Sequence, residues 1–294
     1  MSVTIKPASG QETPDAESLG IVASGWRHQL RATRVVLWRE LLRFAQDRAR
    51  MGAMLLQPLL FLFVMGTGLG SIVDTGGSTS FRTFLFPGVL ATSVLFTAAF
   101  SGISLVWDRE FGFLREMLVA PIGRGAIIVG KCLGGATVAT LQSLLLLALV
   151  GTVGIPYHPL LLIELIGCLF LGALLLTALG VLLSTRIKTI QAAMPMSQLL
   201  IMPMMFLSGS LFPLSGLPGW LSVLTRLNPL TYVVQPMRHI VLTQLSLNDE
   251  ERARLLPVID WFGWQVPVIF QLVTVAVVTT SLMWVAVLSF RRTE

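Results

Sequence analysis

Charged side chains are scarce in this chain of 294 residues, since Asp, Glu, Lys and Arg together make up 12% of it. Soluble domains carry about a quarter charged residues, so the chain lacks the surface charge that keeps a domain of this size in water. Apolar residues make up 54% of the sequence, and the mean hydropathy is +0.79. Such a composition excludes a disordered chain, because disordered chains are poor in side chains that bury themselves. It predicts an integral membrane protein.

Cysteine and histidine are scarce as well. Both cysteines, Cys132 and Cys168, lie inside apolar runs, which favours small buried hydrophobic side chains over a disulfide or a metal pair. The three histidines, His28, His158 and His239, are scattered along the chain, so metal ligation and acid–base catalysis have no support. We expect no catalytic site, no metal and no cofactor in this chain.

What the sequence does contain is a series of long uncharged runs. A helix needs about 20 apolar residues to cross a bilayer, and two of the runs are too long for one helix. Proline and glycine break them at 154–159 and 213–219, where a helix cannot continue. Six transmembrane helices are therefore expected, at 52–73, 83–107, 126–153, 160–185, 190–212 and 266–290. Together they form a transmembrane domain over 52–290 in an all-α membrane protein.

The basic residues are unevenly distributed between the two sides that this topology creates. With a cytoplasmic N-terminus, 16 of the 21 Lys and Arg residues fall on the cytoplasmic side and 5 on the outer side. Cytoplasmic loops retain Lys and Arg, so the split predicts a multi-pass protein of the plasma or inner membrane with both termini inside. The net charge of +6 then reflects orientation rather than nucleic-acid binding.

The segment before the first span has two parts. Residues 1–24 are polar and lack the apolar core of a signal peptide, so we expect a disordered tail. Residues 25–51 are expected to form an amphipathic helix at the cytoplasmic surface, either a topology anchor or a contact for a cytosolic partner. Its expected apolar stripe is Trp26, Leu30, Leu37, Leu41 and Phe44, and Arg31, Arg34 and Arg43 are among its basic residues.

The richest cytoplasmic loop spans 108–121, between the second and third spans. Phe111, Leu114 and Leu118 share one helical face, and the proline at 121 ends the helix. Mixed charge surrounds that face, from Asp108, Arg109, Glu110, Arg115 and Glu116. A short amphipathic helix of this kind either lies on the bilayer or inserts into a groove of another protein.

The next segment imitates a nucleotide-binding motif. Residues 125–132 nearly match G-x-x-x-x-G-K-[ST], but Cys132 stands where a magnesium-binding hydroxyl is required. The segment also opens a membrane helix instead of following a buried strand, so nucleotide binding is rejected. Lys131 is expected to extend its amine to the cytoplasmic interface.

The longest outer segment begins at 213 and is too apolar for a free loop. Its helical pieces are too short to span the membrane and are broken at 228–229 and 235–236, which predicts a helical hairpin over 213–240 that enters the outer leaflet. Trp220, Asn228, Pro229 and Tyr232 mark this outer hairpin. Trp220, Tyr232, Arg226 and Arg238 are its expected interface anchors.

Few polar groups lie within the spans. Glu164 is an acid near the outer face, where it is expected to reach water. Gln142, Ser143, Ser197 and Gln198 are uncharged and are candidates for the lining of a pathway.

In its order of segments the chain resembles the membrane subunit of a type-2 ABC exporter, of the daunorubicin-resistance and nodulation-factor export type. The resemblance covers about residues 25–290. Its specific parts are the loop at 107–121 and the sequence Asn-Pro-Leu-Thr-Tyr at 228–232.

The resemblance implies that the segment matching 108–120 is a coupling helix that docks on a separate ATPase subunit. It further implies two permeases, identical or different, above two ATPases, with the pathway between the permeases and ATP and Mg²⁺ bound by the ATPase. An amphipathic drug or a lipid-like molecule is the expected cargo, and a saccharide or lipo-oligosaccharide is the alternative within this family.

Two other classes of protein remain as alternatives. An ion-coupled transporter requires buried acids and inverted repeats, and neither is visible. An intramembrane lipid-modifying enzyme requires a polar catalytic cluster, for which Glu164 with His158 is the closest approximation.

Overall fold

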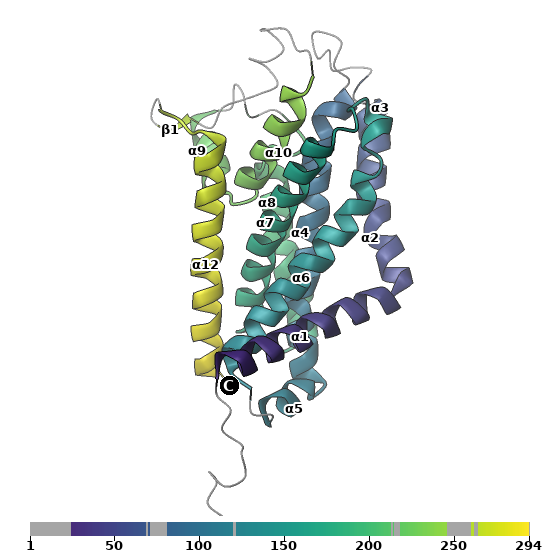
Figure 1. Ribbon diagram of the computed structural model, residues 1–294. Coiled ribbons are helices and arrows are strands. Elements are labelled where there is room, and N and C mark those ends of the chain that lie inside the picture. Colours follow the sequence, from purple (N-terminus) through teal and green to yellow (C-terminus); the bar gives the residue numbers. More distant parts are fainter. Residues whose placement is uncertain are drawn as a thin grey trace, which may run out of the picture.

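The structure is a computed structural model that describes residues 25–68, 70, 81–119, 122–212, 214, 218–245, 260–261 and 264–293. The expected disordered tail, 1–24, lies outside the described residues. Two ends of the molecule serve as reference points below. The "α5 end" is the bottom of Figure 1 and the "hairpin end" is its top.

Among the described residues, six helices are long and apolar enough to cross a membrane, which confirms the expected all-α membrane fold. The first span is built from α2 (Arg48–Leu60), a π-helical turn η1 (Phe61–Met65) and α3 (Gly66–Gly68). The others are α4 (Phe81–Glu110), α6 (Arg124–Leu147), α7 (Pro159–Ser184), α8 (Ile190–Leu207) and α12 (Val268–Thr293). Each overlaps the run from which it was predicted.

Shorter elements cover the two ends of the bundle. At the α5 end, α1 (Trp26–Gln46) lies across the spans and α5 (Phe113–Val119) lies beneath α4 (Figure 1). At the hairpin end are the 3-10 turn η3 (Val150–Val153), α9 (Gly219–Leu227) and α10 (Thr231–Thr243). A two-residue antiparallel ladder joins β1 (Asp260–Trp261) to β2 (Trp264–Gln265).

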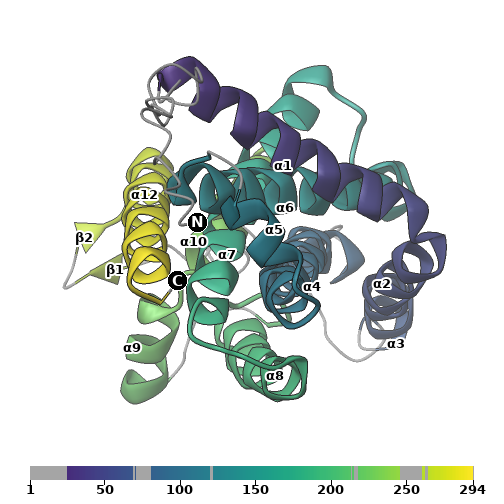
Figure 2. The same ribbon diagram turned by 90° about the horizontal axis from the view of Figure 1, so that it is seen from below.

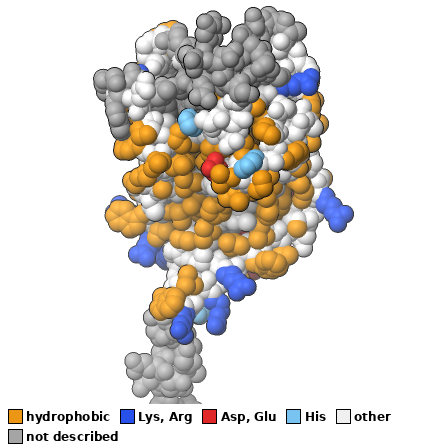
Figure 3. Space-filling view, turned by 45° about the horizontal axis from the view of Figure 1, so that its top comes forward, with side chains coloured by type: hydrophobic (Ala, Val, Ile, Leu, Met, Phe, Trp, Pro, Cys, Tyr) orange, Lys and Arg blue, Asp and Glu red, His pale blue; other side chains and the backbone are white. Residues whose placement is uncertain are grey.

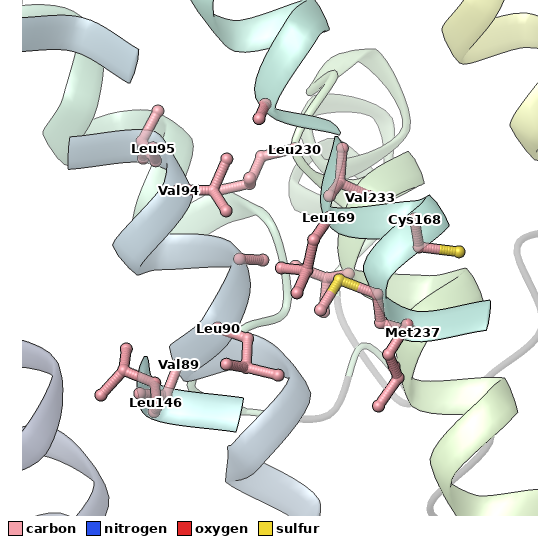
Figure 4. Packing of buried hydrophobic residues seen from close by; sticks show 14 of the residues in the cluster. Val89, Leu90, Val94, Leu95, Leu146, Cys168, Leu169, Leu230, Val233 and Met237 are labelled. Atoms are coloured by element: carbon pink, nitrogen blue, oxygen red, sulfur yellow. The ribbon is translucent and has the colours of Figure 1, made fainter. Parts of the chain in front are cut away.

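The second span, α4, is the centre of the molecule. It contacts α2, α6, α7, α8 and α10, and nearly all of its side chains are buried. Figure 4 shows part of the largest apolar cluster, in which Val94 of α4 faces Leu169 of α7 and Leu230 beside α10. The helix runs without a break from one end of the bundle to the other.

The outer helices present apolar side chains away from this core. Phe63 on α2, Leu199 on α8 and Trp284 on α12 are among the large exposed hydrophobic residues. In the space-filling view an apolar band crosses the molecule, and most of the visible basic side chains lie below it (Figure 3). This is the surface that a helical bundle presents to lipid.

The spans α4 and α7 cross with their backbones close together. A Cβ atom added at Gly102 would lie 2.5 Å from the carbonyl carbon of Gly180, so the two backbones touch there. Small residues at such crossings permit the close packing that holds membrane helices together.

We predict that Gly102→Ala lowers the melting temperature of the purified protein, because the new methyl group must push two backbones apart; overpacking of this kind costs about 1–3 kcal/mol. Gly167→Ala in α7 is the matched control, since nothing lies within 4 Å of its Cβ position and alanine is the better helix former. Thermal unfolding in detergent measures both. Equal melting temperatures for the two variants would show that this crossing does not limit stability.

Candidate coupling site

Three helices meet in a cluster of charged side chains at the α5 end. Lys131 of α6 is fully buried, and its Nζ donates to Glu40 Oε1 of α1 at 2.8 Å and to Ser104 Oγ of α4 at 2.9 Å. The same amine lies 2.5 Å from Asp108 Oδ2, and Asp108 is fully buried too. A buried charge is tolerated only when it is paired and hydrogen-bonded, and these groups supply one another with partners.

Two arginines of α1 complete the cluster. Arg39 donates to Asp108 Oδ2 through Nη2, and Arg43 Nη2 lies 3.5 Å from Asp108 Oδ1. Asp108 is therefore shared by cations from α1 and α6. We refer to Arg39, Glu40, Arg43, Asp108 and Lys131 as the charge cluster.

Glycine allows α1 to approach α6 closely enough for these pairs to form. A Cβ atom at Gly130 would lie 2.8 Å from the Cβ of Val36, and one at Gly134 would lie 2.9 Å from the Cβ of Glu40. The near-match to a phosphate-binding loop therefore has a packing explanation. Gly130 allows α1 to pack closely against α6, and Lys131 binds the carboxylate of Glu40 in α1. The prediction that Lys131 extends to the interface is wrong, since the amine is held inside by Glu40 and Asp108.

The buried face of α1 also differs from the predicted stripe. Ala32, Val36 and Glu40, spaced by one turn, are the buried residues of α1, whereas Trp26 and Leu30 are exposed. The sequence could not identify this face, because Glu40 is an acid and its burial depends on the contact with Lys131 of α6. Arg31 and Arg34 are exposed and Arg43 joins the charge cluster.

The coupling segment divides into two helices. The second span continues through Glu110, three residues past its predicted end, and α5 covers 113–119. Between them Gly112 adopts φ +82°, a left-handed conformation that costs glycine little. The expected single helix over 108–121 is therefore wrong in its boundaries. Its last two positions lie outside the described residues.

The predicted apolar face of this segment points in two directions. Leu114 is buried in a cluster with Leu105 of α4 and Phe290 of α12, and Leu118 packs against the same cluster. Phe111 is 60% exposed, and Phe113 and Val119 are exposed as well. The leucines therefore anchor α5 to its own chain, so the alternatives of lying on the bilayer or inserting into a partner do not apply to them. The phenylalanines remain available at the surface.

Arg109 and Glu110 tie the same segment to the connection between α7 and α8. Arg109 Nη1 donates to the carbonyl of Ser184 at 3.2 Å, and Nη2 donates to that of Thr185 at 3.1 Å. Glu110 Oε2 accepts the backbone N–H of Ile190 at 2.7 Å. The last carbonyls of α7 and the first N–H of α8 lack partners within their own helices, and these side chains provide them. Sequence reasoning missed this role, whereas Arg115 and Glu116 are exposed as expected.

The outer hairpin is held by the sequence Asn-Pro-Leu-Thr-Tyr. Asn228 Nδ2 donates to the carbonyl of Met204 in α8 at 2.7 Å, and its Oδ1 accepts the N–H of Leu230 at 3.0 Å. Tyr232 donates to the carbonyl of Arg226 at 2.9 Å. Pro229 lies at the turn between α9 and α10. The two-helix shape was expected, and its depth in a membrane stays a prediction.

The expected interface anchors of the hairpin have different fates. Trp220 is 67% exposed, as an anchor would be, but Arg238 is fully buried. Its Nη2 donates to the carbonyl of Gly209 at 2.7 Å, and its guanidinium lies 4.0 Å from the ring centre of Phe84. The anchor role for Arg238 is therefore wrong; this side chain joins α10 to the segment after α8 and to α4.

The candidate pathway residues do not converge within one chain. Gln142 and Ser143 of α6 are fully buried, and Gln142 Oε1 accepts a hydrogen bond from Thr97 at 3.1 Å. Ser197 is half-buried and Gln198 is exposed on the outward face of α8. Glu164 is exposed on α7.

These features define an α-helical multi-pass membrane protein in which a surface helix and a short helix at one end are bound rigidly to the spans. The profile of the ABC-2 type transporters matches residues 31–242, and the chain belongs to that family. It is therefore an ABC transporter permease, a non-catalytic membrane subunit that works with an ABC ATPase.

Relatives cover much of the same region. Transport permease ycf38 of Cyanophora paradoxa is 30% identical over 63% of this chain and 66% of its own length. Nodulation protein J of Rhizobium leguminosarum bv. trifolii is 30% identical over 64% of this chain and 72% of its own length. Multidrug ABC transporter permease YbhR of Escherichia coli (strain K12) is 29% identical over 57% of this chain and 46% of its own length.

We predict that Lys131→Met destabilises the permease by about 3–5 kcal/mol, because it leaves buried carboxylates with fewer cations. The double variant Lys131→Met with Glu40→Met removes a complete pair and is expected to recover part of that loss. Arg34→Gln, at an exposed position of α1, is the control and is expected to unfold like the unmodified protein. Thermal unfolding in detergent provides the comparison, and additive effects of the two methionines would contradict a coupled pair.

Proposed function

We propose that this permease is part of an exporter and that its ATPase docks at the α5 end, on Phe111, Phe113, Val119 and the charges of Arg115 and Glu116. The observation that carries the proposal is the combination of exposed aromatic side chains with rigid attachment. Large apolar groups at the exposed end of a helix favour insertion into a groove of a partner. Leu114 fixes the same helix to the core.

The attachments suggest how motion passes from the ATPase to the spans. Asp108 binds α1 and α6 through the charge cluster, and Arg109 and Glu110 hold the α7–α8 connection. A push on α5 therefore acts on α4, α6, α7 and α8 together. Two ATPases that close on ATP and Mg²⁺ would tilt these helices in two permeases, identical or different, and change the access of the pathway between them.

The proposed orientation places the α5 end in the cytoplasm of a cell with the permease in its plasma or inner membrane. Among the described residues Arg82, Arg226 and Arg238 lie toward the hairpin end, and the other Lys and Arg residues gather at the α5 end. The positive-inside rule supports this orientation, and an ATPase that uses cytoplasmic ATP requires it. Both termini are then cytoplasmic.

The proposed cargo is an amphipathic drug or a lipid-like molecule. The relative named as a multidrug ABC transporter permease supports this class.

We predict that Phe111→Ser with Phe113→Ser reduces capture of the ATPase by the purified permease about tenfold or more, because buried aromatic anchors supply much of the energy of an interface. Trp220→Ser at the hairpin end removes an equally exposed ring and is expected to leave capture unchanged. Co-purification from membranes that contain both proteins measures this. Undiminished capture by the variant that lacks both phenylalanines would contradict the proposal that the ATPase docks on α5.

We predict that a cysteine at position 116 is labelled by a membrane-impermeant maleimide only in inverted vesicles, whereas one at position 244 is labelled only in intact cells. Glu116 of α5 and Gln244, which follows α10, are exposed polar residues at opposite ends, and the native Cys132 and Cys168 are buried, which keeps the background low. Labelling of Glu116→Cys from outside would reverse the orientation.

A further inference from the structure

A cavity of about 570 Å³ opens between the α1–α2 junction, α4 and α8. Pockets for small molecules have volumes of about 300–1,000 Å³, so this one is large enough for a ligand. Seen from the α5 end, α2 and α8 lie on either side of α4 (Figure 2). The cavity thus lies beside two of the three least buried of the described spans.

The two ends of the cavity differ in chemistry. Arg43, Asp47 and Arg50 line it where α1 passes into α2, whereas Met54, Phe96 and Phe100 line it farther along the spans. Because a helix rises 1.5 Å per residue, the cavity wall on α4 extends about 16 Å from Phe96 to Trp107. A polar head at the α5 end and an apolar tail directed into the bilayer would match this gradient.

The polar end favours a negative head. The guanidinium groups of Arg43 and Arg50 line the cavity, together with the carboxylate of Asp47. Asp47 caps α2, because its Oδ1 accepts the backbone N–H of Arg50 at 3.0 Å. Within the described part of the chain Arg50 forms no ion pair. Its guanidinium lies 5.3 Å from the ring centre of Phe100. An arginine held by an aromatic ring, with its N–H donors free, is well suited to a phosphate or a carboxylate.

A second observation supports a ligand at this position. A smaller recess of about 40 Å³ adjoins the cavity and shares Arg43, Asp47 and Arg50 with it. Ser101 lines the recess, is 8% exposed and has a buried hydroxyl without a partner. An unpaired buried hydroxyl is costly, and an oxygen of a head group that reaches the recess could accept its hydrogen bond.

We propose that this cavity binds the negatively charged head of an amphiphilic cargo, a phosphate or carboxylate on an apolar tail, which enters from the inner leaflet between α2 and α8. The inference rests on the proposed export function, and it narrows the class of cargo. Arg50 is the principal contact of the head, Arg43 and Ser101 assist it, and Phe96 and Phe100 receive the first part of the tail.

Trp107 lines the same cavity and provides a local signal. The permease alone is placed in phosphatidylcholine nanodiscs with a minor fraction of lipid whose acyl chain is brominated next to the head group, so that it quenches tryptophans near the head. The brominated lipid carries a phosphate monoester, a phosphocholine or a trimethylammonium head. The part of the quenching that comes from Trp107 is the difference between the protein and its Trp107→Phe variant.

The expected result is strongest quenching of Trp107 by the phosphate lipid, and an apparent affinity for that lipid about tenfold or more weaker in Arg50→Gln. Arg48→Gln is the matched control, because Arg48 belongs to the same helix and is exposed, but does not line the cavity. Met54→Trp, which fills the cavity without removing a charge, is expected to abolish the preference. Equal quenching by all three heads, or preference for the cationic head, would overturn the proposal.

A second measurement separates cargo from a resident lipid. In vesicles that contain the permease with its co-purified ATPase, ATP is expected to move the phosphate lipid to the opposite leaflet, and Arg50→Gln is expected to slow this movement. Binding without movement, while the ATPase remains docked, would overturn the cargo assignment. Loss of docking would instead contradict the proposed function, and the binding measurement does not depend on the ATPase.

Discussion

The buried contact of Lys131 with Glu40 and Asp108 is the interaction on which the rest of the α5 end depends. Burial of an ion costs several kcal/mol unless partners and hydrogen bonds compensate for it, so Lys131 requires the carboxylates and each carboxylate requires a cation. They come from α6, α1 and α4. The requirement fixes the angle and depth at which α1 lies on the bundle, and it makes a surface helix part of the core.

The same region shows how a short segment can tie several membrane helices together. Asp108, Arg109 and Glu110 are consecutive residues, yet they bind α1 and α6, the end of α7 and the start of α8. Leu114 then fixes α5 to α4 and α12. The segment 108–114 thus holds five spans and α1 together. A rigid junction transmits displacement better than a flexible loop, because packed interiors move as units.

Packing is uneven around α4. On the side of α6 and α7 the helices touch through small residues such as Gly102 and Gly180, and the interior is dense. On the side of α2 and α8 a cavity remains, with charge at one end and aromatic rings along its length. The dense half preserves the fold, whereas the open half has room for a ligand. The two properties are divided between opposite faces of one central helix.

The sequence by itself determined the six spans, because a bilayer demands about 20 apolar residues for each crossing and the runs in this chain satisfy that demand almost one for one. It also located the segment of α5 and the helical hairpin. Only the tertiary structure decided which side chains of these segments are free. A charged side chain is expected in solvent or at the membrane interface, and the sequence alone predicts such positions for Lys131, Asp108 and Arg238. Instead, partners from segments distant in sequence hold these three side chains inside the protein. Hydropathy is a property of each segment, whereas the pairing of charges depends on which segments the fold brings together.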